Sequence, residues 1–256
     1  HPHDIAPREF REQANRALAF APDLAIEPNE SSAVTRAVLT NTLDATVEAH
    51  IAFDVADDSS WEITPVEVRL RARPGETADQ TFDFFYDFAQ LAPLPTYRYT
   101  LSYAGTPIFE RSGTVSPKLS RIPIWGLAGG HDLSLVEEEN AVWAEAETDK
   151  NSWIDLTKHF EDDYQLVYGR VFVYSPNARD VAAEVRSGDV LTVSVGEVEA
   201  VEHDGNTPGP AYVSLPLEAG WNTVLVSSDG QEGEWGFALR ISDVDGKLKF
   251  SAQPQE

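Results

Sequence analysis

One run near the end of the chain constrains the fold most strongly. Apolar side chains occupy every second position from Trp235 to Ile241, and small or polar side chains lie between them. This period of two is typical of a half-buried antiparallel strand. The turn at residues 243–246 (DVDG) and a second alternating run at Leu248 and Phe250 predict a hairpin. A chain built from such hairpins is expected to form β-sandwiches.

The composition excludes several classes of partner. The chain has 43 acidic and 19 basic side chains and a formal net charge of −24. Such a field repels nucleic acids and anionic membrane surfaces. Cysteine is absent, which excludes disulfides and zinc-thiolate sites. No apolar run approaches the roughly 18 residues of a membrane span. We therefore expect no nucleic-acid partner and no membrane insertion.

The pattern of strands predicts an all-β chain with two tandem sandwiches. Residues 22–115 hold short alternating runs separated by turns, typical of an immunoglobulin-like sandwich. Residues 116–130 are expected to be a linker, and residues 131–256 have the strand spacing of a jelly roll. The N-terminal segment, residues 1–21, carries apolar side chains at helical spacing over residues 8–20, which predicts a short helix.

Two sets of segments carry a resemblance to known families. The segment SSWEITPVEVRLRARPGETADQTFDF (59–84) resembles immunoglobulin-like domains that accompany glycoside hydrolases and their carbohydrate-binding modules. The second half is similar to galactose-binding-type jelly rolls in WIDLTKHF (153–160), YGRVFVYSP (168–176), LEAGWNTVLV (217–226) and WGFALRISDVDGKL (235–248). In large secreted bacterial enzymes such domains flank catalytic units. The acidic turn common in relatives is reduced here to Gly188-Asp189, so a spacer that keeps the fold without binding remains an alternative.

Tryptophans are the expected ligand-binding residues, because sugar rings stack on exposed indole planes. Trp125, Trp143 and Trp153 lie near the linker and the domain edge and are the candidates, with packing between the domains as the alternative. Three other tryptophans lie in predicted strands and are assigned to the core: Trp61, Trp221 and Trp235. The pattern also favours burial of three aromatic side chains on one strand face: Tyr168, Phe172 and Tyr174.

Acidic clusters are candidates for a structural calcium ion. The candidate ligands are Asp162 and Asp163, and Asp243 and Asp245 in the DVDG turn. An EF-hand loop starting at Asp243 would need an acidic residue where Pro254 stands, so the alternative is a plain Asp-Gly turn.

His1 is a candidate copper ligand, because an N-terminal histidine can offer both its amino group and its imidazole. Oxidative polysaccharide-cleaving monooxygenases use such a site with a further histidine. The candidates for that ligand are His50, His131, His159 and His203. Methionine is absent even at position 1, so we expect a processed or excised chain in which His1 is the accidental start of a fragment.

The sequence contains no nucleophile elbow, His-Glu-x-x-His motif or phosphate-binding glycine loop. We therefore expect a non-catalytic accessory region of a secreted bacterial polysaccharide-acting protein, located outside the cell, in the periplasm or on the cell surface. Its partners would be a polysaccharide or other glycan and a catalytic domain of the same polypeptide. The alternatives are a structural or adhesive module, and an enzyme that uses copper at His1 or two carboxylates.

Overall fold

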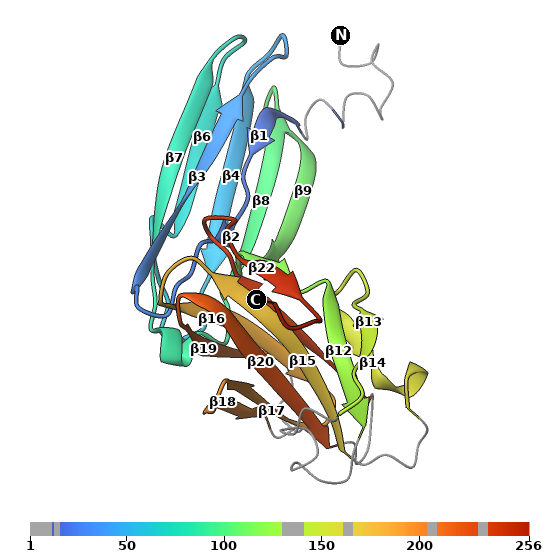
Figure 1. Ribbon diagram of the computed structural model, residues 1–256. Coiled ribbons are helices and arrows are strands. Elements are labelled where there is room, and N and C mark those ends of the chain that lie inside the picture. Colours follow the sequence, from blue (N-terminus) through green and yellow to red (C-terminus); the bar gives the residue numbers. More distant parts are fainter. Residues whose placement is uncertain are drawn as a thin grey trace. The chain divides into compact units, whose positions relative to one another are not determined.

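The computed structural model describes residue 12 and residues 16–129, 141–160, 166–203, 209–229 and 235–255 (Figure 1). The chain divides into two compact units, residues 1–26 with 30–117 and residues 27–29 with 118–256. Both are built from β-sheets, as predicted, with two short 3₁₀ turns, η1 (Phe88–Gln90) and η2 (Leu156–Lys158). In the described part of the chain, no helix has the length and apolar character needed to cross a membrane.

Two four-stranded sheets form the first unit. One has the order β1-β3-β7-β5, with β1 (Leu18–Ala19), β3 (Ser32–Thr40), β7 (Thr77–Phe85) and β5 (Glu62–Thr64). The other has the order β6-β4-β8-β9, with β6 (Glu67–Ala72), β4 (Val47–Asp54), β8 (Thr96–Tyr103) and β9 (Thr106–Thr114). A short parallel pair joins β2 (Asp23–Leu24) to β10 (Ser116–Pro117).

Aromatic rings pack the two sheets of the first unit against each other. The Phe53 ring on β4 lies 5.2 Å from that of Phe82 and 5.3 Å from that of Phe84, both on β7. Trp61 is buried, as predicted, and its indole N–H donates to the Leu91 carbonyl at 2.7 Å. Buried and more exposed side chains alternate along β4, so one face of this strand points into the core.

A five-stranded and a seven-stranded sheet form the second unit. The five-stranded sheet has the order β11-β21-β16-β19, with β14 also paired to β21: β11 (Leu119–Arg121), β21 (Gly236–Ser242), β16 (Arg179–Ser187), β19 (Ala211–Leu217) and β14 (Trp153–Asp155). The seven-stranded sheet has the order β13-β12-β15-β20-β17-β18, with β22 also paired to β15: β13 (Ala144–Glu147), β12 (Ile124–Gly129), β15 (Leu166–Ser175), β20 (Gly220–Asp229), β17 (Val190–Val195), β18 (Val198–His203) and β22 (Lys249–Ser251).

Trp125 lies in the core between these two sheets. It is fully buried, and its ring meets that of Phe237 on β21 edge-on at 5.1 Å. The expectation that Trp125 is a surface residue is therefore wrong. The expectation of a linker over residues 116–130 is also wrong, because β10, β11 and β12 occupy most of it and β12 carries Trp125 inward.

The prediction of a hairpin at the end of the chain is wrong as well. Residues 243–246 do form a turn, with the Gly246 amide donating to the Asp243 carbonyl at 3.2 Å. The strands on either side of the turn lie in different sheets, however, because β21 pairs with β16 while β22 pairs with β15. The turn thus connects the two layers of the sandwich, and Phe250 packs against the core from the second layer.

Most of the predicted N-terminal helix lies outside the described residues. Within them, Glu12, Arg16 and Ala17 are helical, and the chain then enters β1.

The burial of Trp125 generates a direct test. Trp125→Ala should lower the free energy of unfolding of the second unit by about 3–5 kcal/mol, because the other side chains cannot fill the cavity that remains. Chemical denaturation followed by tryptophan fluorescence and circular dichroism measures this change. Val142→Ala is the control, since Val142 is 88% exposed. A loss below about 1 kcal/mol for Trp125→Ala would contradict the placement of this residue in the core.

Candidate functional site

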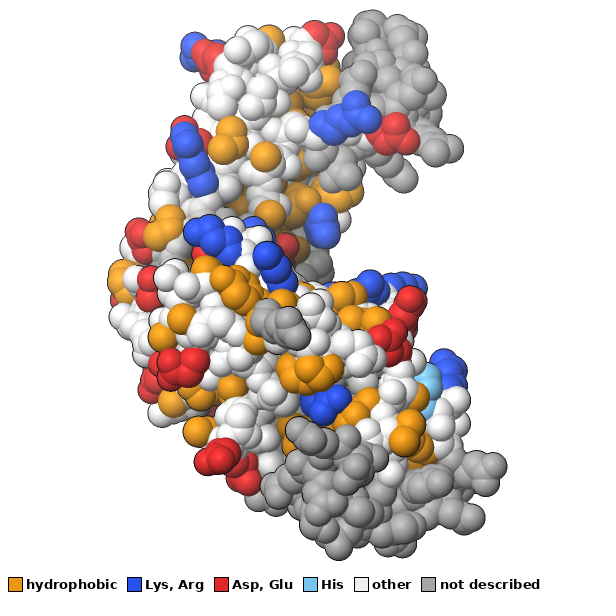
Figure 2. Space-filling view, viewed as in Figure 1, with side chains coloured by type: hydrophobic (Ala, Val, Ile, Leu, Met, Phe, Trp, Pro, Cys, Tyr) orange, Lys and Arg blue, Asp and Glu red, His pale blue; other side chains and the backbone are white. Residues whose placement is uncertain are grey.

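The outer surface of the seven-stranded sheet is the candidate site, and β15 determines which side chains it displays. Val167, Val171 and Val173 are buried in the core, whereas Arg170 and Phe172 alternate with them on the opposite side and are half-buried. We call this surface the aromatic face and define it by six half-buried or exposed residues: Trp143, Arg170, Phe172, Tyr174, Trp221 and Lys249. Figure 2 shows hydrophobic side chains on this side of the second unit, with basic side chains among them.

Strand pairing brings residues from three strands together at one end of the face. Tyr174 on β15 is opposite Trp221 on β20 and Lys249 on β22. The rings of Tyr174 and Trp221 meet edge-on with centroids 5.4 Å apart. The Lys249 ammonium lies 5.3 Å from the centroid of the Tyr174 ring. This end of the face therefore holds two aromatic rings and one cation.

A second cation lies between aromatic rings further along β15. The Arg170 guanidinium carbon is 3.9 Å from the centroid of the Trp143 ring and 5.0 Å from that of Phe172. Trp143 reaches this position by lying across Gly126 of β12. A Cβ atom at Gly126 would be 3.4 Å from Cε3 of the Trp143 ring, so a larger residue there would press on the indole. The contacts with both rings restrict the orientations that the guanidinium can take.

Neither cation of the aromatic face pairs with an acidic side chain that the structure describes. No described carboxylate lies within ion-pair distance of Arg170 or Lys249. The Nε atom of Arg170 is buried and has no hydrogen-bond partner among the described residues. Burial lowers the pKa of the Arg170 guanidinium, but a guanidinium is so weakly acidic that the group stays protonated at neutral pH.

The three tryptophans predicted to bind ligand do not come together. Trp125 is in the core, and Trp143 lies on the aromatic face. Trp153 is half-buried on the five-stranded sheet, where it pairs with Ala238 of β21. Of the predicted ligand-binding residues, Trp143 alone belongs to the aromatic face.

Sequence reasoning missed the other aromatic residues of this face. Trp221 is half-buried and lies on the outer side of β20, so its assignment to the core is wrong; Asn222 and Val224 point inward in its place. Phe172 and Tyr174 are likewise half-buried, whereas Tyr168 is buried as predicted. The residue that could have revealed this is Arg170, because it lies on the same side of β15 as Phe172 and Tyr174. A charged side chain marks that side as the one nearer to solvent.

Asp243 and Asp245 are engaged by cations and backbone amides of the protein. An oxygen of Asp243 accepts from the amides of Lys247 and Leu248 at 2.9 and 3.2 Å. Arg179 pairs with Asp245 at 3.1 Å and lies 3.8 Å from Asp243. The described residues contain no group of three or more acidic, histidine or cysteine side chains arranged to hold a metal ion. This arrangement favours the plain turn over a calcium site at these two residues.

Most of the remaining candidate metal ligands lie outside the described residues. His1, His131, Asp162 and Asp163 lie outside the described residues, as does the side chain of His203. His50 contacts Glu67 at 2.7 Å on the outer side of the first unit, and His159 is exposed after η2.

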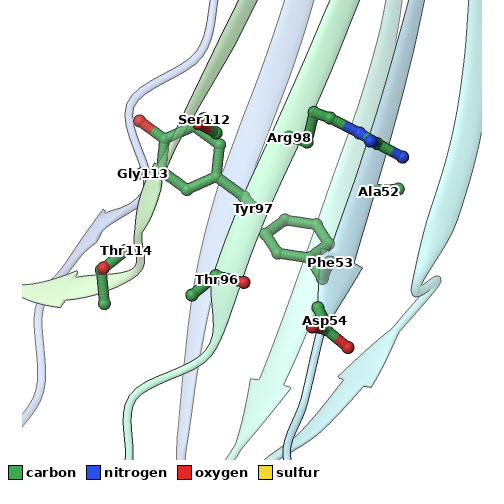
Figure 3. A pocket seen from close by; sticks show the side chains of 9 residues that line it. All are labelled: Ala52, Phe53, Asp54, Thr96, Tyr97, Arg98, Ser112, Gly113 and Thr114. Carbon is green, nitrogen blue, oxygen red and sulfur yellow. The ribbon is translucent and has the colours of Figure 1, made fainter.

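A hollow of about 660 Å³ lies on the first unit, where β4, β8 and β9 meet (Figure 3). Its polar lining consists of Asp54, Thr96, Arg98, Ser112 and Thr114. The Arg98 and Asp54 side chains lie apart in the figure, and the Phe53 and Tyr97 rings that also line it are almost fully buried. The lining contains one carboxylate, whereas most glycosidases use a pair. This hollow offers no open aromatic surface.

Comparisons with known proteins do not identify the function of this site. No protein-family model matches the chain, and no curated protein matches it. An anti-sigma factor domain-containing protein is 11% identical, with a TM-score of 0.34 and 90% of each chain covered. A lectin from Pleurotus ostreatus in complex with GalNAc is 14% identical, with a TM-score of 0.29 and 92% of this chain and 84% of that chain covered.

A GH78 family rhamnosidase of Bacillus sp. GL1 is also 14% identical, with a TM-score of 0.28, and the alignment covers 92% of this chain but 33% of the rhamnosidase. TM-scores of this size carry no argument about function.

The ion pair between Arg179 and Asp245 in the turn at residues 243–246 can be tested by a pH titration. Partial burial acts to raise the pKa of Asp245, but hydrogen bonds from Arg179 and Lys247 lower it more, so the pKa lies below its usual value. Arg179→Gln should therefore move the pKa of Asp245 upward, as measured by carboxyl NMR during a pH titration. Lys158→Gln is the control, because Lys158 pairs with Asp155 instead. An unchanged pKa in Arg179→Gln would mean that Arg179 is not the counter-ion of this turn.

Proposed function

We propose that the second unit binds a glycan on the aromatic face, as a non-catalytic accessory region of a secreted bacterial polysaccharide-acting protein. One observation carries the proposal: the rings of Trp143, Phe172, Tyr174 and Trp221 share one face of the sheet and are half-buried. Sugar rings present C–H groups that pack on aromatic surfaces of this kind.

The rigidity of the aromatic face favours binding. Tyr174 and Trp221 support each other edge-on, and Arg170 fills the space between Trp143 and Phe172. Side chains that are already fixed lose little conformational entropy when a ligand packs on them. All of them except Trp143 also lie on regular strands, which position side chains more firmly than loops do.

A structural or adhesive module without glycan affinity is the main rival. That rival predicts that every large aromatic side chain of the second unit is fully buried, as Trp125 is. The half-buried state of Trp143 and Trp221 favours the binding proposal instead. The accessory role, the bacterial extracellular location and a catalytic domain in the same polypeptide belong to the proposal, and their support is the sequence resemblance of residues 59–84 and 153–248.

Affinity electrophoresis against a panel of neutral and acidic polysaccharides tests this proposal. The protein should be retarded by at least one of them, and Trp143→Ala and Trp221→Ala should each weaken the interaction by roughly tenfold or more, because each removes a ring from the face. Phe85→Ala is the matched control, since Phe85 is a 44% exposed aromatic residue of the first unit.

Thermal melting separates binding from folding in the same set of variants. Since Trp143 and Trp221 are half-buried, their replacement should lower the melting temperature much less than Trp125→Ala does. Uniform mobility of the folded protein across the whole panel would refute the binding proposal and leave the structural module as the better account.

A further inference from the structure

The aromatic face holds two cations that pair with no acidic side chain in the described part of the chain. The chain has 43 acidic and 19 basic side chains, so a basic side chain has many possible partners. Elsewhere such partners are found: Arg36 meets Asp79 at 2.8 Å, and Arg186 meets Glu184 at 3.0 Å. Arg170 and Lys249 instead lie on aromatic rings, and no described carboxylate pairs with either. Their charges therefore remain available to a ligand.

The guanidinium of Arg170 is arranged to receive an anion. Its Nε atom is buried. Its terminal nitrogens are not fully buried, and no described residue forms a hydrogen bond with them. The rings of Trp143 and Phe172 hold the group in place. A planar guanidinium whose terminal N–H groups have no partner among the described residues matches the two oxygens of a carboxylate or sulfate.

The spacing of the two cations suits a polymer. Lys249 is opposite Tyr174, which is four residues along β15 from Arg170. At about 3.3 Å per residue, the backbone positions of the two residues are offset by roughly 13 Å along the strand. This span is longer than one sugar ring, and the rings of Phe172 and Tyr174 lie within it. Two acidic groups on different sugars of one chain could thus meet the two cations while other sugars pack on the rings.

We propose that the ligand of the aromatic face is an anionic polysaccharide, whose sugars carry carboxylate or sulfate groups. This inference rests on the proposed function and specifies its ligand class. The formal net charge of −24 opposes the approach of a polyanion at low ionic strength. Salt at about 0.1 M reduces the Debye length to about 10 Å, so the distant acids are screened while direct contacts with Arg170 and Lys249 persist. Binding should accordingly be detectable at moderate salt and weaken at high salt.

Titration calorimetry with matched oligosaccharides tests the inference. The probes are oligomers of galacturonate, mannuronate and sulfated galactose, each paired with its methyl-esterified or desulfated form. In at least one pair the acidic form should bind about tenfold or more tightly than its neutral counterpart, as expected for a charge-assisted contact. Arg170→Gln and Lys249→Gln should each remove most of this preference.

The matched control is Arg36→Gln, which removes the same charge from an exposed ion pair of the first unit and should leave binding unchanged. Lys249 is exposed, so Lys249→Gln keeps the test valid even if Arg170→Gln perturbs the fold. Equal affinity for acidic and neutral forms in every pair would overturn the inference while the proposed function stands. Absence of binding to every oligosaccharide and polysaccharide, acidic or neutral, would refute both.

Discussion

The close packing beneath Gly169 constrains everything that the second unit displays. A Cβ atom at this position would lie 2.6 Å from Cζ of Phe237 and 3.3 Å from Cε3 of Trp125, so no larger residue fits without a shift of the core. A slip of β15 by one residue would place Arg170 in this space and turn the valines outward. The core thus fixes the register of β15, and the register determines which side chains reach the aromatic face.

Pairing of β15 with its neighbours then assembles the face from distant parts of the chain. Trp221 comes from the next strand of the sheet, and Lys249 comes from a strand that enters the sheet only after the turn at residues 243–246. Each cation–ring contact contributes about 0.5–1 kcal/mol at an exposed site, which is modest. We infer that Arg170 and Lys249 matter more for ligand recognition than for the stability of the unit.

The sequence predicted well which residues form strands, but it predicted less well which strands pair with one another. Alternation revealed β4 and β15 as strands, because that signal is local, but it did not reveal that the valines of β15, and not Phe172 and Tyr174, point inward. It did not reveal β12, whose short run follows two prolines and ends in glycine and was therefore taken as part of a linker. It also joined residues 235–251 into one hairpin, since a turn sequence does not show whether the next strand stays in the same sheet.

Local sequence patterns also could not show which aromatic residues of the second unit reach the candidate site. Alternation shows that Phe172 and Tyr174 share a side of β15, but strand pairing and the cover on that side decide how exposed they are. Trp143 and Trp125 were equal candidates because both lie near the predicted linker and domain edge, yet Trp143 lies on the aromatic face and Trp125 is in the core. Contacts between residues far apart in sequence separate these two tryptophans, and no local pattern contains that information.

A glycan bound on the aromatic face would change the surroundings of the two tryptophans that lie there. A two-dimensional NMR spectrum of the tryptophan indole N–H groups, recorded while an oligosaccharide that binds in the calorimetry is added, detects this change. The signals of Trp143 and Trp221 should shift with saturating titration curves, while those of the buried Trp61 and Trp125 stay in place. Saturating shifts of other tryptophans, with Trp143 and Trp221 unaffected, would contradict the account and place the binding site elsewhere.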